Sequence, residues 1–95
     1  LAFKIKFLAQ KLKMFYNLPS VLEIRQCGFM VGIELRGPWE DRLGAKICQR
    51  LRQEGIILRP LGNVIVIMPP LVITQGQLNH LLDCTYRTIK EYERK

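Results

Sequence analysis

The chain has 95 residues, of which 48% are hydrophobic, and carries a formal net charge of +7 at pH 7. This length accommodates one small domain, and this apolar fraction is that of a globular protein and not of a disordered tail. No run of about 18 apolar residues is present, so the sequence predicts neither a membrane span nor a membrane partner.

The first third of the chain predicts one helix followed by two strands. Apolar residues recur at four- and three-residue steps from Leu1 to Phe15, and the helix is expected to end before Pro19, because proline disfavours helical geometry in the residue before it. Two runs, 21–27 and 29–35, then have the composition of strands. In the second run apolar residues alternate with other types, so one of its faces is apolar.

The middle of the chain predicts a second helix and a second pair of strands. Apolar residues at four-residue steps over 39–51 indicate the helix, and Gly55 provides its left-handed stop. Strands are expected over 56–58 and 64–68, on either side of a turn at 60–63.

Thr74 and Gln77 have the spacing of a capping box at the start of a third helix, and the mixed-charge tail 86–95 is expected to fray. The predicted order is helix, strand, strand, helix, strand, strand, helix. This order indicates an α+β fold, with a small, mostly antiparallel sheet and helices on one face.

Arg59 is a lone cation at the end of an apolar run, where a strand would deliver it to a turn. The guanidinium fork binds a carboxylate or phosphate through two hydrogen bonds, so an arginine beside apolar surface indicates an anionic ligand. The alternative is an edge arginine whose stem covers apolar surface while its head stays in water. Residue type and setting alone do not decide between the two.

The sequence contains no recognisable catalytic or metal-binding pattern. Cys27, Cys48 and Cys84 are widely spaced without a C-x-x-C pair, which is typical of reduced, mostly buried thiols in a cytoplasmic protein. His80 is the only histidine, so we predict no metal site. Counting leaves a Cys–His nucleophile open, but a surface or packing role fits His80 better.

Four of the positive charges, on Lys4, Lys6, Lys11 and Lys13, fall in a first segment that contains no acid. A basic helix can contact phosphates, and its binding then depends on salt concentration. No aromatic strand, zinc finger or Gly-x-x-Gly loop of the kind found in nucleic-acid-binding domains accompanies these lysines. A solvated helix face, or one facing an acidic partner, is therefore the preferred interpretation.

Four segments together resemble the C-terminal small domain of class III pyridoxal-phosphate aminotransferases. They are G-F-M-V-G-I-E-L (28–35), R-L-G-A-K-I-C (42–48), G-I-I-L-R-P-L-G-N (55–63) and I-M-P-P-L-V-I (67–73). Within that class, the R-P-L-G-N turn is most similar to the members that make 7,8-diaminopelargonate in biotin biosynthesis.

The resemblance implies that residues 1–95 are a single C-terminal small domain of a fold-type I enzyme, and a fragment of a longer chain. Arg59 would bind the carboxylate of a small keto-amino acid substrate, and Pro60, Gly62 and Asn63 would form the turn beside it. Some members carry an aromatic residue at the place of Val66, so substrate packing there is expected to differ.

The family's pyridoxal-phosphate lysine belongs to a preceding large domain, so the resemblance implies no catalytic or cofactor-binding residue in this chain. The missing large domain would be its partner, within a parent enzyme that is a homodimer. The sequence thus predicts the substrate-binding part of an aminotransferase that is not active alone. The alternative is a free-standing basic α+β binding module, acting on nucleic acid through its lysines.

Overall fold

The computed structural model describes residues 2–38, 41–70 and 72–93, and the predicted order of elements is confirmed. The elements are α1 (Ala2–Leu12), the 3₁₀ helix η1 (Lys13–Asn17), β1 (Val21–Cys27), β2 (Met30–Leu35), α2 (Leu43–Arg52), β3 (Arg59–Leu61), β4 (Val64–Ile67) and α3 (Gln75–Glu93). Leu1, Trp39 and Leu71, which the sequence analysis included in its patterns, lie outside the described residues.

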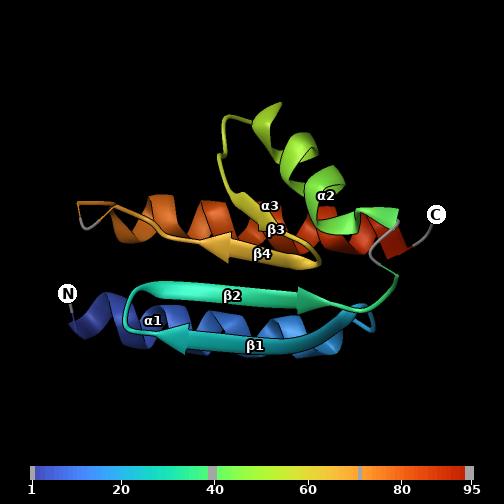
Figure 1. The fold of residues 1–95 in the computed structure, drawn as a ribbon. Helices are drawn as coiled ribbons and strands as arrows, with labels where there is room; N and C mark the ends of the chain where they lie inside the picture. The colour runs from blue at the N-terminus through green and yellow to red at the C-terminus, as the bar shows by residue number, and fades with distance from the viewer. Residues whose placement is uncertain (1, 39–40, 71, 94–95) are drawn as a thin grey trace.

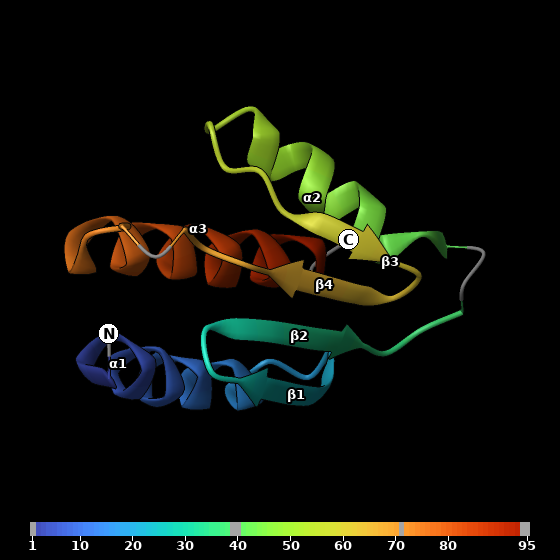
Figure 2. The same ribbon diagram turned by 60° about the vertical axis from the view of Figure 1, so that its left-hand side comes forward.

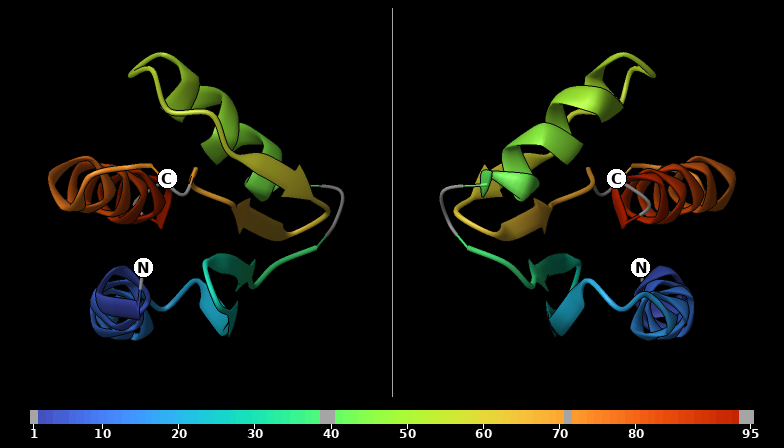
Figure 3. Two further views of the ribbon diagram at one scale, coloured as in Figure 1. Left: turned by 90° about the vertical axis from the view of Figure 1, so that its left-hand side faces the viewer. Right: turned by 90° about the vertical axis from the view of Figure 1, so that its right-hand side faces the viewer.

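The strands form one antiparallel sheet in the order β1-β2-β4-β3. Helices α1 and α3 lie side by side behind the sheet, and α2 packs on α3 and along β3 (Figures 1 and 3). None of the described helices covers the opposite face of the sheet, which is called the open face below (Figure 3). The predicted α+β class, with a small antiparallel sheet and helices on one face, is confirmed.

The core lies between the sheet and the helices. Alternate strand residues face it, because successive side chains on a strand point to opposite faces. The strands contribute Val21, Val31, Ile33, Leu35, Ile65 and Ile67, and the helices contribute Leu8, Leu12, Ile47, Leu51, Leu78, Leu82 and Ile89, all at most 5% exposed. The periodicities read from the sequence for the first two helices and the second strand therefore identify the buried faces of α1, α2 and β2 correctly.

The end of α2 is fixed by a Schellman cap. The Ile56 N–H donates to the Leu51 carbonyl and the Gly55 N–H donates to the Arg52 carbonyl, each at 3.0 Å, with Gly55 at a φ of 80°. Leu51 and Ile56 are both buried, which supplies the apolar contact that accompanies this cap. The predicted stop at Gly55 is confirmed, and it turns the chain back towards the sheet (Figure 2).

The predicted position of the third strand is wrong. Ile56 and Leu58 are buried but belong to no strand, and β3 begins only at Arg59. Pro60 lies inside β3, which is possible because β3 is an edge strand and proline need not donate on its outer side. The turn is accordingly limited to Gly62 and Asn63, with the glycine at a φ of 61°.

The capping box at the start of α3 is confirmed, and the expected fraying of its end is wrong as far as residue 93. The Thr74 N–H donates to Gln77 Oε1 at 3.0 Å, and the Gln77 N–H donates to Thr74 Oγ1 at 3.1 Å. At the other end, Glu93 Oε2 accepts hydrogen bonds from the N–H and the hydroxyl of Ser20, at 2.9 and 2.5 Å. This contact with the start of β1 holds the last turn of α3.

Candidate functional site

One row of residues crosses the open face of the sheet. Arg25 on β1 pairs with Gly32 on β2, Gly32 with Val66 on β4, and Val66 with Arg59 on β3. Directly paired residues on neighbouring strands point to the same face. Arg59 therefore projects from the face opposite to the helices, with its guanidinium on the solvent side.

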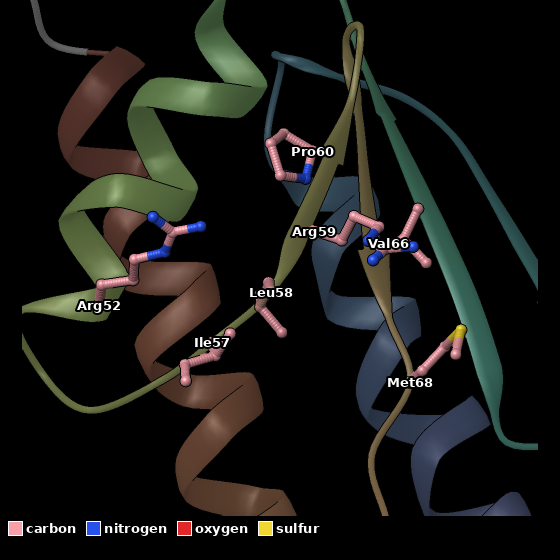
Figure 4. Close-up of a pocket in the computed structure, with 7 residues that line it drawn as sticks. All are labelled: Arg52, Ile57, Leu58, Arg59, Pro60, Val66 and Met68. Carbon is pink, nitrogen blue, oxygen red and sulfur yellow. The ribbon is translucent and has the colours of Figure 1, made fainter.

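A hollow of about 420 Å³ lies around Arg59. Figure 4 shows its lining: Arg52, Ile57, Leu58, Arg59, Pro60, Val66 and Met68. Arg59 extends from β3 over Val66, while Ile57 and Met68 are apolar side chains that remain 81% and 63% exposed. The hollow thus combines apolar walls with a cation, which is the pairing that an aliphatic carboxylate requires.

The guanidinium of Arg59 makes no hydrogen bond or ion pair within the described residues. Two other arginines, by contrast, form ion pairs: Arg25 lies 2.8 Å from a carboxylate oxygen of Glu23, and Arg87 lies 2.9 Å from one of Glu54. All five donors of the Arg59 guanidinium are therefore available to a ligand. Its binding of a carboxylate stays a prediction that this geometry permits.

Gly62 and Asn63 lie next to the hollow in sequence but do not line it. Asn63 is only 7% exposed, and its Nδ2 donates to the Gly37 carbonyl at 2.6 Å. Its own carbonyl accepts from the Leu35 N–H at 2.8 Å. These bonds fix the turn that joins β3 to β4, so Asn63 acts on the position of the hairpin, while Pro60 is part of the hollow's wall.

Gly44 provides a second anchor for this turn. A Cβ at this position would lie 2.9 Å from the Gly62 carbonyl oxygen, closer than real Cβ contacts allow. The first turn of α2 can therefore meet the backbone of the turn only because residue 44 has no side chain. Helix, turn and β3 are positioned as one unit.

Arg52 and Met68 belong to the hollow, although sequence reasoning did not identify them. Arg52 lies on the last turn of α2, and Met68 directly follows β4. The apolar periodicity of the sequence did not indicate them, because Arg52 lies outside the buried stripe of α2 and Met68 lies beyond the end of β4. The R-P-L-G-N motif pointed to the neighbourhood, but only the packing of α2 beside β3 brings these side chains to the hollow.

The cysteines are free and form no reactive centre with the hollow. Cys27 is exposed, whereas Cys48 and Cys84 are buried. Burial raises the pKa of the Cys48 thiol to about 11, a shift that the nearby Arg52 charge partly opposes. Cys84 Sγ lies 3.6 Å from His80 Nε2 and 3.4 Å from Arg87 Nη2, and none of these three residues lines the hollow around Arg59.

The part of the chain that the structure describes contains no group of three or more His, Cys, Asp or Glu side chains able to hold a metal ion. Nor does any helix within those ranges have the length and apolar character of a membrane span.

In the basic first segment, Lys11 pairs with Asp83 at 3.0 Å.

Pyridoxal phosphate requires a lysine for its imine bond, and no described lysine lines the hollow around Arg59. The side chains that surround Arg59 are apolar apart from Arg52. They fit the carboxylate end of an organic acid and do not fit the cofactor, so we assign no cofactor contact to them.

The fold is a small helix-backed sheet domain, and the hollow beside β3 is lined by arginine and apolar side chains. The family model for class III aminotransferases matches residues 2–89. The chain belongs to this family, as the four motifs of the sequence predicted.

Two relatives and one fold neighbour illustrate the similarity. The chain is 42% identical over 100 residues to the adenosylmethionine-8-amino-7-oxononanoate aminotransferase of Aquifex aeolicus. The matched region covers 97% of this chain and 22% of that protein. The crystal structure of the enzyme of the same name from Methanocaldococcus jannaschii superimposes with a TM-score of 0.87 at 38% identity, over 93% of this chain and 22% of that one.

A Vibrio fluvialis aminotransferase in its PMP-bound form shares the fold, with a TM-score of 0.91 at 22% identity over 96% of this chain and 22% of that one. The chain therefore spans about a fifth of the length of the proteins it matches. The class III assignment, the resemblance to the diaminopelargonate-forming members and the fold of the small domain are confirmed.

Proposed function

We propose that this chain is the C-terminal, substrate-binding part of a pyridoxal-phosphate-dependent aminotransferase that makes 7,8-diaminopelargonate in biotin biosynthesis. Arg59 binds the carboxylate of the keto-amino acid, and the apolar walls of the hollow contact its methylene chain. The observation that carries the proposal is an exposed arginine, without a partner in the described residues, beside Ile57 and Met68.

The chemistry of the named substrate fits this arrangement. An 8-amino-7-oxononanoate has its carboxylate at one end of an unbranched chain and its reacting ketone at carbon 7. A hollow that holds the carboxylate is therefore separated from the reacting carbon by the methylene chain. The present chain would orient the substrate, and a different part of the protein would carry out amino transfer.

The proposal extends to the rest of the protein. Pyridoxal phosphate and its lysine belong to a large domain outside residues 1–95, and the intact enzyme is a cytoplasmic homodimer. Residues 1–95 alone are inactive, because they hold the substrate's carboxylate without the group that reacts with its ketone. The coding sequence upstream of Leu1 tests this directly: an open frame encoding a lysine-bearing cofactor domain supports the proposal, and an in-frame stop codon overturns it.

The role of Arg59 is tested by Arg59→Ala in the intact enzyme. We expect KM for the carboxylate substrate to rise about 10- to 100-fold, the equivalent of about 1.5–3 kcal/mol for hydrogen bonds to a charged group. The absorbance of the bound cofactor stays unchanged, because Arg59 is assigned to the substrate. A Lys6→Gln, Lys13→Gln double variant removes two exposed charges away from the hollow and is the matched control.

Two results would contradict the assignment of Arg59. One is loss of the cofactor spectrum in Arg59→Ala, and the other is an equal loss of activity towards an analogue whose carboxylate is replaced by an amide. The alternative function, a free-standing polyanion-binding module, predicts instead salt-sensitive binding of nucleic acid that the lysine double variant weakens.

A further inference from the structure

The hollow contains a second cation. Arg52 lies on α2 and Arg59 on β3, and both line the same space, in which the described residues include no acidic side chain (Figure 4). Within the described part of the chain, the guanidinium of Arg52 also makes no hydrogen bond or ion pair. Figure 4 shows its side chain extending from α2 towards β3.

The neighbouring charges on α2 and α3 behave differently. Arg50 lies 3.8 Å from Glu54 and Arg87 lies 2.9 Å from it, so Glu54 is engaged by these two arginines and not by Arg52. The Schellman cap at Gly55 fixes the backbone at Arg52, whose carbonyl accepts the Gly55 N–H. The position of Arg52 beside the hollow is therefore set by backbone geometry, while its charge is not neutralised locally.

A cation near the end of a helix is favourable with respect to the helix dipole, and this effect alone gives Arg52 a structural role. The helix dipole, however, does not explain why Arg52 lines the same hollow as Arg59, in which the described residues include no acidic side chain. A concave surface lined by charges of one sign concentrates the field and attracts ligands of the opposite sign. Its range in salt solution is about 10 Å at 0.1 M, so the attraction depends on ionic strength.

We propose that Arg52 is a second substrate-positioning residue, which attracts the carboxylate of the aliphatic acid to the hollow and strengthens its binding at Arg59. This inference rests on the proposed function. It predicts selectivity for acids over uncharged analogues, because the described lining of the hollow includes two positive charges and no negative one. Arg52 does not contact the reacting carbon, so its charge contributes equally to binding in the ground state and the transition state.

The test uses the intact enzyme with Arg52→Gln and, as a matched control, Arg42→Gln. Arg42 precedes α2 at its other end, is exposed and does not line the hollow. We expect Arg52→Gln to raise KM for the carboxylate substrate about 3- to 10-fold at low salt, and less than about twofold near 0.5 M salt, with kcat unchanged. Arg42→Gln leaves KM within about twofold.

Two further variants separate charge from packing. Arg52→Lys keeps the charge and is expected to retain most of the affinity, whereas Arg52→Met keeps the aliphatic stem and is expected to match Arg52→Gln. The inference is overturned by a KM in Arg52→Gln equal to that in Arg42→Gln at low salt. It is equally overturned by the same rise in KM for the amide analogue, since this result indicates a packing role.

The outcome for Arg59→Ala distinguishes this inference from the proposed function. A large effect of Arg59→Ala without an effect of Arg52→Gln overturns only the role of Arg52. An absence of effect in both variants overturns the substrate assignment of the hollow itself. The inference is supported if both variants raise KM at low salt and if added salt reduces the rise mainly in Arg52→Gln. This result indicates a direct contact of the substrate with Arg59 and a longer-range attraction by Arg52.

Discussion

Replacing Gly44 by alanine tests whether the α2 helix and the β3–β4 turn are packed as closely as the structure shows. The new Cβ would lie 2.9 Å from the Gly62 carbonyl oxygen and within 3.8 Å of two backbone atoms of Asn63. Those atoms belong to a turn held by the Leu35–Asn63 and Asn63–Gly37 hydrogen bonds. The neighbouring backbone therefore cannot yield without disturbing other contacts.

Two opposing effects determine the change in the free energy of unfolding. Alanine in place of glycine in a helix stabilises by about 0.5–1 kcal/mol, because glycine loses more backbone entropy on folding. Overpacking of a closely fitted site costs about 1–3 kcal/mol. We expect the second effect to prevail, with a net destabilisation of about 0.5–2 kcal/mol, or a fall in Tm of about 2–16 °C.

Gly76→Ala is the matched control for this substitution. Gly76 is also the second residue of its helix, but a Cβ there would find no atom closer than Thr74 Oγ1 at 4.0 Å. Urea unfolding followed by circular dichroism gives both free energies. Since the helix-propensity effect is shared, the difference between the two variants isolates the cost of the contact, about 1–3 kcal/mol. Equal stability of the two variants would refute the close approach.

Two further predictions concern the helix cap and the thiols. Thr74→Ala removes the capping box of α3 and should lower the free energy of unfolding by about 1 kcal/mol, whereas Thr74→Ser, which keeps the hydroxyl, should change it by only a few tenths; equal losses in urea unfolding would count against the cap. In the native protein, Ellman's reagent should react quickly with Cys27 and slowly with the buried Cys48 and Cys84, and uniform rates for the three would contradict their burial. Because burial raises the pKa of Cys48 from 9.0 to about 11, the unfolded state loses this proton first as the pH rises. Stability should therefore fall between those pH values, and Cys48→Ala should reduce the slope of that fall, as unfolding measured across the range would show.

The local sequence signals predicted most elements correctly, because each depends on neighbouring residues. The capping box at Thr74 and the left-handed stop at Gly55 involve contacts within a few residues, and both are present. The third strand was misplaced because the buried residues of this segment are not the residues that pair with β4. Ile56 and Leu58 are apolar for packing in the core, whereas the hydrogen-bonded register with β4 starts at Arg59.

The candidate site was predicted in part for the same reason. Arg59 could be identified because a cation within an apolar run is a local anomaly, and the family resemblance gave it a ligand. Arg52 looks like an ordinary basic residue in the last turn of an exposed helix face. Similarly, the mixed-charge end of α3 gave no sign that Glu93 bonds to Ser20, 73 residues away.

The sequence by itself determined the order of the elements, the apolar faces of α1, α2 and β2, the family and the lone arginine. Hydrophobic periodicity and turn residues carry this information, because both depend on residues that are close together in the sequence. Only the tertiary structure decided that β2 lies between β1 and β4, and that Arg25, Gly32, Val66 and Arg59 form one row on the open face. It also decided that Arg52 and Arg59 share a hollow, because strand register and helix packing depend on contacts between residues far apart in the chain.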